Sequence, residues 1–271
     1  MLIKPPSLPH ILALAALTCA SAGASADSSI DRARQRGSLL AGVDHVAPEY
    51  VATTKFRTPE SIATALVQDV SRRLRVKPAP LQADAAKRPQ LLASGDADVV
   101  LAAPPGNDPL RRTAVIVPTG YAAAPMAIMR TDTDIKSWDQ LKGRTVCLSG
   151  DGRYAGTIAA QYGAVEKVFK APADSLLALR TGKCDAAVHD DVLLEELLKL
   201  PEWKKFSARL PAGQRTPLVF AVPARDPKAE VYLKQVAAEW QASGMLAQLV
   251  NKQARSIAFE VYLDQDVPDC H

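Results

Sequence analysis

The chain has 271 residues, a formal net charge of +4 and 23% charged residues. This nearly balanced charge, without any dense basic block, excludes the usual electrostatic pattern of a nucleic-acid-binding protein. After the N-terminal apolar run no segment has the length or apolarity of a membrane span, so we expect a protein that is not embedded in a membrane.

The N-terminus has the pattern of a secretory signal peptide. Lys4 supplies a positive charge, Ile11–Leu17 is an unbroken apolar run, and small residues lead to Ala24-Ser25-Ala26, an A-x-A cleavage signature. The run is too short to span a bilayer, and a buried soluble helix would show a polar face. We therefore predict a signal peptide over residues 1–26, cleavage after Ala26 and export to the periplasm. A lipoprotein acylated at Cys19 is the alternative.

The first part of the exported chain predicts alternating strands and helices. Gly37–Asp44 is a short β-type run that leads to a loop, and Leu91–Ala102 passes from a helix end through Gly95 into a buried strand. Between them, Pro59–Leu74 has helical spacing, with one apolar face formed by Ile62, Leu66, Val70 and Leu74.

The same order of elements returns later in the chain. Gly143–Gly150 is again a strand followed by a loop, Tyr154–Tyr162 is predicted to form a helix, and Leu177–Val188 repeats the helix end, glycine and strand around Gly182. The two copies share the frame Leu-x-x-Gly-x-x-Asp. We therefore predict an α/β fold of two lobes, each a mainly parallel sheet flanked by helices. Ligands of such sheets bind outside the carboxyl ends of the strands, which places a crevice between the lobes.

Three segments carry a resemblance to a known family. Ile30–Asp44 is similar to the motif I-x-x-R-G-x-L-x-V-G-V, Ile135–Val146 to I-K-S-x-x-D-L-K-G-K-x-V, and Asp185–Asp190 to D-A-x-x-x-D. Over nearly all of residues 30–250 the chain resembles the bacterial extracellular solute-binding proteins of family 3, which serve polar amino-acid ABC importers. The resemblance implies the type II periplasmic-binding-protein fold, in which the second lobe is inserted into the first and two hinge strands join them.

This resemblance implies the domain boundaries. After the signal peptide, residues 27–124 and 222–271 would form lobe 1, and residues 125–221 would form the inserted lobe 2. The chain would cross outward near Ala122–Ala127 and return near Leu218–Pro223. Asp226–Leu249 would form one or two helices that pack back on lobe 1.

The resemblance also implies the ligand-binding residues. Arg111, ten residues before Tyr121, would bind a ligand carboxylate, and Asp190 would bind its ammonium group, with His189 beside it. A guanidinium suits a carboxylate because it bonds both oxygens. A surface charge or an ion pair between the lobes is the alternative for both charged residues. Three further residues complete the expected site: Ser149, Gly150 and Tyr50.

The sequence departs from the family pattern in front of this arginine. Family members that bind amino acids carry a Thr-x-Thr-like segment whose hydroxyl and amide groups support the carboxylate. Here Pro104 and Pro105 precede Gly106, and proline has no N–H to donate. The first-lobe contacts to a ligand therefore differ from the pattern, while the second-lobe contacts are retained.

Three cysteines follow the signal peptide, so at least one has no partner within the chain. Cys147 and Cys184 fall on two strands that we expect side by side, and relatives with the same T-V-C and C-D pattern look alike here. We predict a disulfide between them, with two buried thiols as the alternative, and a mobile Cys270. No cysteine or histidine cluster has metal-ligand spacing, so we expect neither a metal nor a cofactor.

We therefore predict a monomeric periplasmic solute-binding protein that captures a small polar ligand, an amino acid or a related compound, and delivers it to an inner-membrane ABC permease. A non-transport accessory or sensor protein of the same fold is one alternative. The other is an enzyme similar to periplasmic cyclohexadienyl dehydratases, which need a carboxylic acid in the cleft to protonate a leaving hydroxyl. Glu49, Asp151 and Asp191 are the candidate acids.

Overall fold

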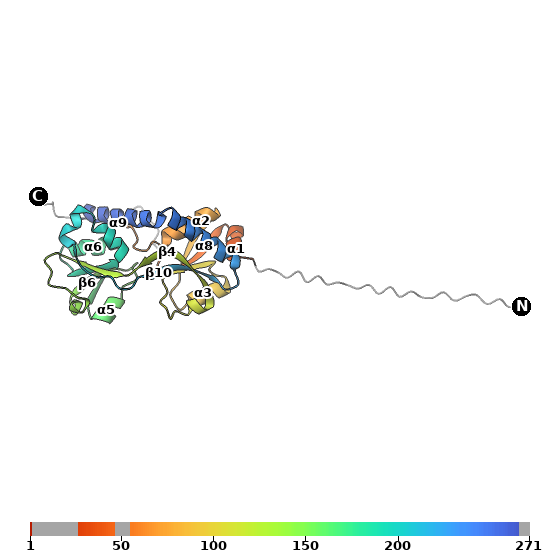
Figure 1. Cartoon of the computed structure of the whole chain (residues 1–271), viewed down its shortest axis with the longest axis horizontal. Coiled ribbons are helices and arrows are strands. Elements are labelled where there is room, and N and C mark those ends of the chain that lie inside the picture. Colours follow the sequence, from red (N-terminus) through yellow and green to blue (C-terminus); the bar gives the residue numbers. More distant parts are fainter. Residues whose placement is uncertain (2–26, 47–54, 266–271) are drawn as a thin grey trace.

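Two five-stranded mixed sheets, one in each lobe, form the framework of the computed structural model, which describes residues 27–46 and 55–265 together with Met1 (Figure 1). Residues 2–26 of the predicted signal peptide, together with Glu49, Tyr50 and Cys270, lie outside the described residues. Across the described part of the chain, no helix combines the length and the apolarity needed to cross a membrane.

The first lobe is built on the sheet β2-β1-β3-β10-β4. Strands β1, β2 and β3 are parallel, and β10 runs antiparallel to both β3 and β4. Its elements are α1 (Ser29–Arg36), β1 (Ser38–Val43), α2 (Ala63–Leu74), β2 (Lys77–Gln82), α3 (Arg88–Ser94), β3 (Val99–Ala102), α4 (Leu110–Thr113), β4 (Ala114–Ala123), β10 (Thr216–Pro223) and α8 (Pro227–Ala242).

The second lobe repeats this plan on the sheet β7-β6-β8-β5-β9. Strands β6, β7 and β8 are parallel, and β5 is antiparallel to β8 and β9. Its elements are β5 (Pro125–Met129), the 3-10 turn η1 (Trp138–Leu141), β6 (Thr145–Ser149), α5 (Thr157–Tyr162), β7 (Val165–Phe169), α6 (Pro172–Arg180), β8 (Ala186–Asp190), α7 (Asp191–Leu197), the 3-10 turn η2 (Pro201–Phe206) and β9 (Ala208–Leu210). The predicted fold class is confirmed.

The internal repeat has a structural basis in both lobes. Gly95 and Gly182 adopt the left-handed conformation, with φ of +80° and +73°, which suits glycine at a helix end. Three residues later, the backbone N–H of Asp98 donates to the carbonyl of Leu40 at 2.8 Å. The equivalent N–H of Asp185 donates to the carbonyl of Thr145, also at 2.8 Å. The shared sequence frame therefore joins the glycine turn to the first parallel strand of each sheet, β1 and β6.

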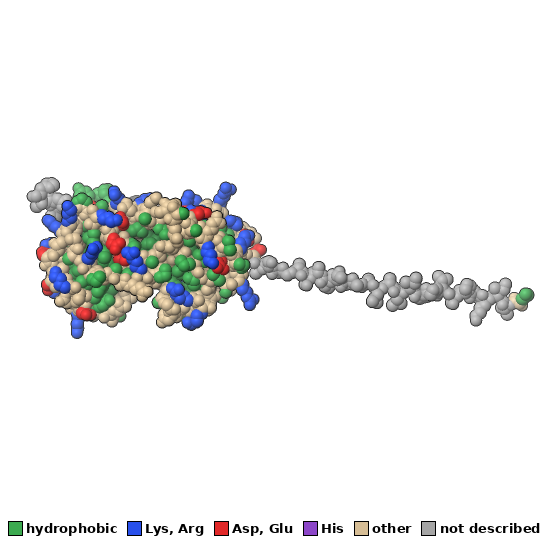
Figure 2. Space-filling view, viewed as in Figure 1, with side chains coloured by type: hydrophobic (Ala, Val, Ile, Leu, Met, Phe, Trp, Pro, Cys, Tyr) green, Lys and Arg blue, Asp and Glu red, His purple; other side chains and the backbone are tan. Residues whose placement is uncertain are grey.

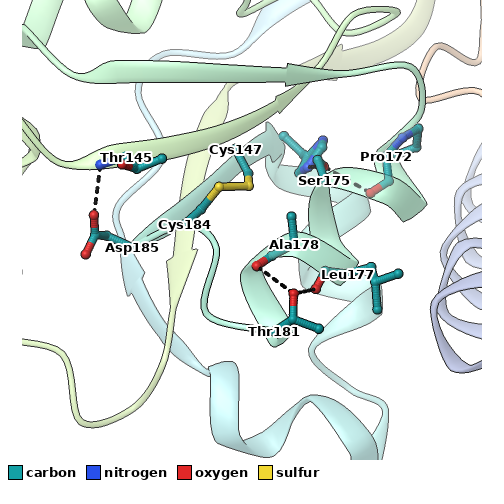
Figure 3. Close-up of a disulfide and its surroundings, with 10 residues drawn as sticks. Thr145, Cys147, Pro172, Ser175, Leu177, Ala178, Thr181, Cys184 and Asp185 are labelled. Atoms are coloured by element: carbon teal, nitrogen blue, oxygen red, sulfur yellow. Dashed lines mark hydrogen bonds between the residues drawn. A yellow bond between two sulfur atoms is a disulfide. The ribbon is translucent and has the colours of Figure 1, made fainter. Parts of the chain in front are cut away.

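The predicted disulfide joins Cys147 to Cys184, with a Cα–Cα distance of 5.8 Å (Figure 3). Cys147 lies in β6, and Cys184 lies in the segment just before β8, its parallel neighbour. Beside the bridge, the Asp185 carboxylate accepts a hydrogen bond from the N–H of Thr145 at 2.8 Å (Figure 3). The bridge closes a segment with a sequence separation of 37 residues.

The chain crosses between the sheets at two places. β4 ends at Ala123 in the first sheet and β5 begins at Pro125 in the second, so the outward crossing is at Ala124. The return lies in residues 211–215, between β9 and β10. Residues 218–223, where we expected the return, belong to β10, which already pairs with β3 and β4 in the first sheet.

The last helix, α9 (Met245–Leu263), extends over both lobes (Figure 1). Its first turns pack on the core of the first lobe through Met245, Leu246, Leu249 and Val250. Its later turns belong to the core of the second lobe through Ala254, Ile257, Ala258 and Val261. The expectation placed all of residues 222–271 with lobe 1, whereas the structure divides this helix between the two cores.

The visible surface carries charges of both signs without one dominant patch. Figure 2 shows Lys and Arg side chains dispersed over the whole face, with acidic side chains among them. This dispersal agrees with the modest net charge of the sequence and gives no extended basic stripe on this face.

Candidate functional site

A cavity of about 380 Å³ lies between the two lobes, within the size range of small-molecule sites. Most of its charged lining comes from the carboxyl ends of parallel strands, as expected for open α/β sheets. From the first lobe and its hinge strands it is lined by Asp44, His45, Glu60, Ser61, Ile62, Ala63, Ala85, Arg88, Leu101, Ala103, Pro105, Asp108, Tyr121 and Leu218. From the second lobe it is lined by Gly150, Asp151, Gly152, Arg153 and Asp190.

Asp190, the last residue of β8, lines this cavity but is already bound by the protein. Its carboxylate accepts hydrogen bonds from the hydroxyls of Tyr121 at 2.7 Å and Tyr154 at 2.6 Å, and from Nη2 of Arg153 at 2.9 Å. Burial and the Asp190 charge raise the pKa of both tyrosines, which keeps them as neutral donors. The Arg153 guanidinium thus occupies the place where a ligand ammonium was expected.

His189 is fully buried behind Glu60 rather than in the cavity wall. Its Nδ1 lies 2.9 Å from Oε2 of Glu60, and its Nε2 lies 2.7 Å from the hydroxyl of Ser175. Oε1 of Glu60 also accepts from the backbone N–H of Asp190 at 3.1 Å. Burial opposes a charge on His189, but the nearby Glu60 carboxylate outweighs it, and the pKa of His189 is raised. Glu60 precedes α2 of the first lobe, so this pair joins the lobes.

Ser149 and Gly150, in the glycine loop after β6, likewise have partners within the protein. The hydroxyl of Ser149 donates to Asp151, and the N–H of Gly150 donates to the carbonyl of Phe169 at 2.7 Å. The second oxygen of Asp151 accepts from the N–H of Glu60 at 2.8 Å. Burial and the neighbouring Glu60 charge raise the pKa of Asp151 to about 7. Close to neutral pH, therefore, some molecules carry this carboxyl in its protonated form and others in its ionised form.

Arg111, the expected carboxylate ligand, binds the loop in front of it. Its Nη2 donates to the carbonyl of Pro104 at 2.8 Å and its Nε to that of Pro105 at 3.0 Å. Pro105 lines the cavity, whereas Arg111 is not among its described lining residues. The structure therefore brings Asp190 and Gly150 to the cavity, places Ser149 and His189 behind it, and leaves Arg111 at its edge.

Arg88 and Arg153 are the guanidinium groups among the described residues of the cavity lining. Arg88 donates to the carbonyl of Ala83 at 3.1 Å and pairs with Asp44, and its Nη1 lies 3.6 Å from Asp108.

Asp191, a candidate acid, is not among the described lining residues of the cavity. Its carboxylate accepts a hydrogen bond from the N–H of Ala124 at 2.9 Å, beside the outward crossing.

Sequence reasoning missed five charged groups of this site: Asp44, Glu60, Arg88, Asp108 and Arg153. Two of them had a usable signal, because Asp44 follows β1 directly and Arg153 follows the loop after β6, where strand ends predict ligand contacts. Glu60 had no usable signal, since an acidic residue in front of a helix is equally expected as a favourable partner of the helix dipole.

The described residues contain no group of three or more His, Cys, Asp or Glu side chains that could hold a metal ion.

No family model and no curated protein matches this chain in sequence. Solved structures do match. An ancestral cationic amino-acid solute-binding protein superposes with a TM-score of 0.59 and 19% identity, over 83% of this chain and 99% of the other. An amino-acid ABC transporter substrate-binding protein of Streptococcus pneumoniae, bound to L-arginine, gives 0.57 and 15% over 84% and 98%. The cysteine-binding protein of Campylobacter jejuni gives 0.55 and 18% over 85% and 94%.

These similarities define the class of fold. The chain has the two-lobed type II periplasmic-binding-protein fold found in amino-acid solute-binding proteins, as the resemblance of its motifs implied.

Proposed function

We propose that the protein is exported to the periplasm as a monomer, captures a small polar ligand between its lobes and delivers it to an inner-membrane ABC importer. The observation that carries this proposal is the cavity of about 380 Å³ lined by charged residues of both lobes. A ligand that contacts both walls at once stabilises the closed arrangement over an open one. The names of similar structures, which include proteins for cationic amino acids, L-arginine and cysteine, support a small polar ligand.

The test is ligand binding by the purified chain without residues 1–26. Melting temperatures are measured with amino acids, amines and small acids, and mass spectrometry identifies any ligand released from the protein as purified. A true ligand at a hundredfold excess over its dissociation constant stabilises the fold by about 2.7 kcal/mol. Ala103→Phe, which adds a ring to the cavity wall, is the control and should lose this shift. A chain that binds no compound and releases none would contradict the proposal.

A second candidate function is general-acid catalysis by Asp151. One observation favours it: a buried carboxyl with a pKa of about 7 lines the cavity, and general acids work best when their pKa lies near the operating pH. The ancestral protein of similar fold is also described as a precursor of cyclohexadienyl dehydratase. Turnover of prephenate by the purified protein, abolished by Asp151→Asn, would establish it. No turnover, or turnover unchanged in that variant, would exclude it.

A further inference from the structure

The groups predicted to receive a ligand carboxylate are already occupied by partners within the protein. Arg111 donates to two carbonyls of its own loop, the N–H of Gly150 donates to Phe169, and the hydroxyl of Ser149 donates to Asp151. Pro104 and Pro105 have no N–H to offer. Among the described residues, these predicted donors are therefore not free for a ligand carboxylate, and leaving water without replacement hydrogen bonds is costly.

The two arginines of the lining are not free to bind a ligand carboxylate, because carboxylates of the protein already neutralise both. Arg153 is held 2.9 Å from Asp190. Arg88 lies between Asp44 and Asp108. A ligand carboxylate beside either arginine would approach a fixed carboxylate of the same sign, and like charges placed together are strongly unfavourable.

The cavity instead has a surplus of acceptors. Five carboxyl groups line it, from Asp44, Glu60, Asp108, Asp151 and Asp190. Glu60 is paired with His189 and Asp190 with Arg153. Protonation neutralises part of Asp151. Asp44 and Asp108 must then share Arg88, which leaves about one excess negative charge on the first-lobe wall, so a cation would compensate it.

Asp44 is the accessible member of this acidic pair. Its side chain is 37% exposed, against 3% for Asp108. One oxygen binds Arg88, while Oδ2 accepts no hydrogen bond from any residue that the structure describes. Apolar side chains form another part of the cavity wall, among them Ile62, Leu101 and Leu218. A charged N–H group at Asp44 and a short chain of methylene groups against this wall would match both features.

We propose that the ligand is an organic cation without a carboxylate, an aliphatic amine or guanidine, held by Asp44, rather than a free amino acid. This inference rests on the proposed function, since it names the chemical class that the same cavity would take. Three observations support it independently. The predicted carboxylate donors are occupied, carboxylates of the protein neutralise both lining arginines, and the first-lobe wall carries an excess carboxylate.

The experiment compares ligands that differ only in the α-carboxylate. Isothermal titration of the chain without residues 1–26, at pH 7, is carried out with arginine and agmatine, ornithine and putrescine, and lysine and cadaverine. In at least one pair the decarboxylated member should bind about tenfold or more tightly than its amino acid, because it avoids placing a carboxylate beside fixed carboxylates. Asp44→Asn should weaken that binding about tenfold, since it removes the charge partner of the cation. Asp139→Asn, an exposed carboxylate in η1 of the second lobe, should leave it unchanged.

The outcomes separate this inference from the function on which it rests. If an amino acid binds as tightly as its decarboxylated partner, the inference is overturned and ligand capture stands. The same holds if only neutral or anionic compounds bind, or if Asp44→Asn binds the amine with unchanged affinity. If no compound binds and mass spectrometry detects no released ligand, both proposals fail.

Discussion

The buried carboxyl of Asp151 gives a sharp expectation for the pH dependence of stability. Its pKa is raised from an ordinary 3.8 to about 7 by burial and by the Glu60 charge. Between these values the folded chain holds a proton that the unfolded chain releases. The stabilising contribution of Asp151 is therefore fully present below about pH 4 and is lost as the pH rises through 7.

The size of this loss follows from the two pKa values. The difference between the folded and unfolded pKa values corresponds to about 4 kcal/mol of stability over the full pH range. About 3 kcal/mol of this stability is lost between pH 5 and pH 8. Asp151→Asn removes the titration and keeps the shape of the side chain. The free energy of unfolding of this variant, relative to that of the native chain, should therefore rise by about 3 kcal/mol from pH 5 to pH 8.

Urea denaturation of both proteins at several pH values, followed by tryptophan fluorescence, measures this difference. Asp139→Asn is the matched control, because its carboxylate is exposed and should give a curve parallel to that of the native chain. Parallel curves for Asp151→Asn and the native chain would show that Asp151 titrates normally in the folded protein, and would also remove the basis of the general-acid alternative.

Three further substitutions test the packing around the site. Glu60→Gln deprives the buried His189 of its anionic partner and should cost about 3 kcal/mol in urea denaturation at pH 6; a change below 1 kcal/mol, on the order of a surface pair, would contradict the pairing. The double variant Cys147→Ser, Cys184→Ser should lose about 4 kcal/mol of unfolding free energy, because the unfolded chain regains loop entropy. If added reductant leaves the unfolding midpoint of the native chain unchanged, that result would argue against the bridge. Ile257→Ala should cost about 3 kcal/mol, since its side chain is fully buried in the second core; an unchanged unfolding midpoint would place α9 away from that lobe.

The regular parts of the fold were predictable because they depend on local signals. The spacing of Leu66 and Val70 marks one face of α2, and both are fully buried in the first core. Gly95 and Gly182 mark helix ends through a backbone conformation that few other residues adopt. Such features act over a few residues, so the sequence pattern contains them directly.

The site was only partly predictable because its contacts join residues far apart in the chain. Asp190 lies at the cavity, but the donors that occupy it come from β4 and from the loop after β6. Glu60 meets His189 across 129 residues. Arg111 has the expected place in the sequence, yet the carbonyls that hold it belong to the prolines that replace the usual donors. A motif specifies residue types, whereas the choice of partner depends on the folded geometry.

The division of α9 between two cores has a consequence for how the molecule moves and unfolds. Its 19 residues form a rod of about 28 Å, with one end embedded in each lobe. Any separation of the lobes must bend this rod, detach one end, or turn about the glycine at position 244 that precedes it. The lobes thus have a third mechanical link besides the two crossing segments, and we expect loss of packing in one core to destabilise the other through this helix.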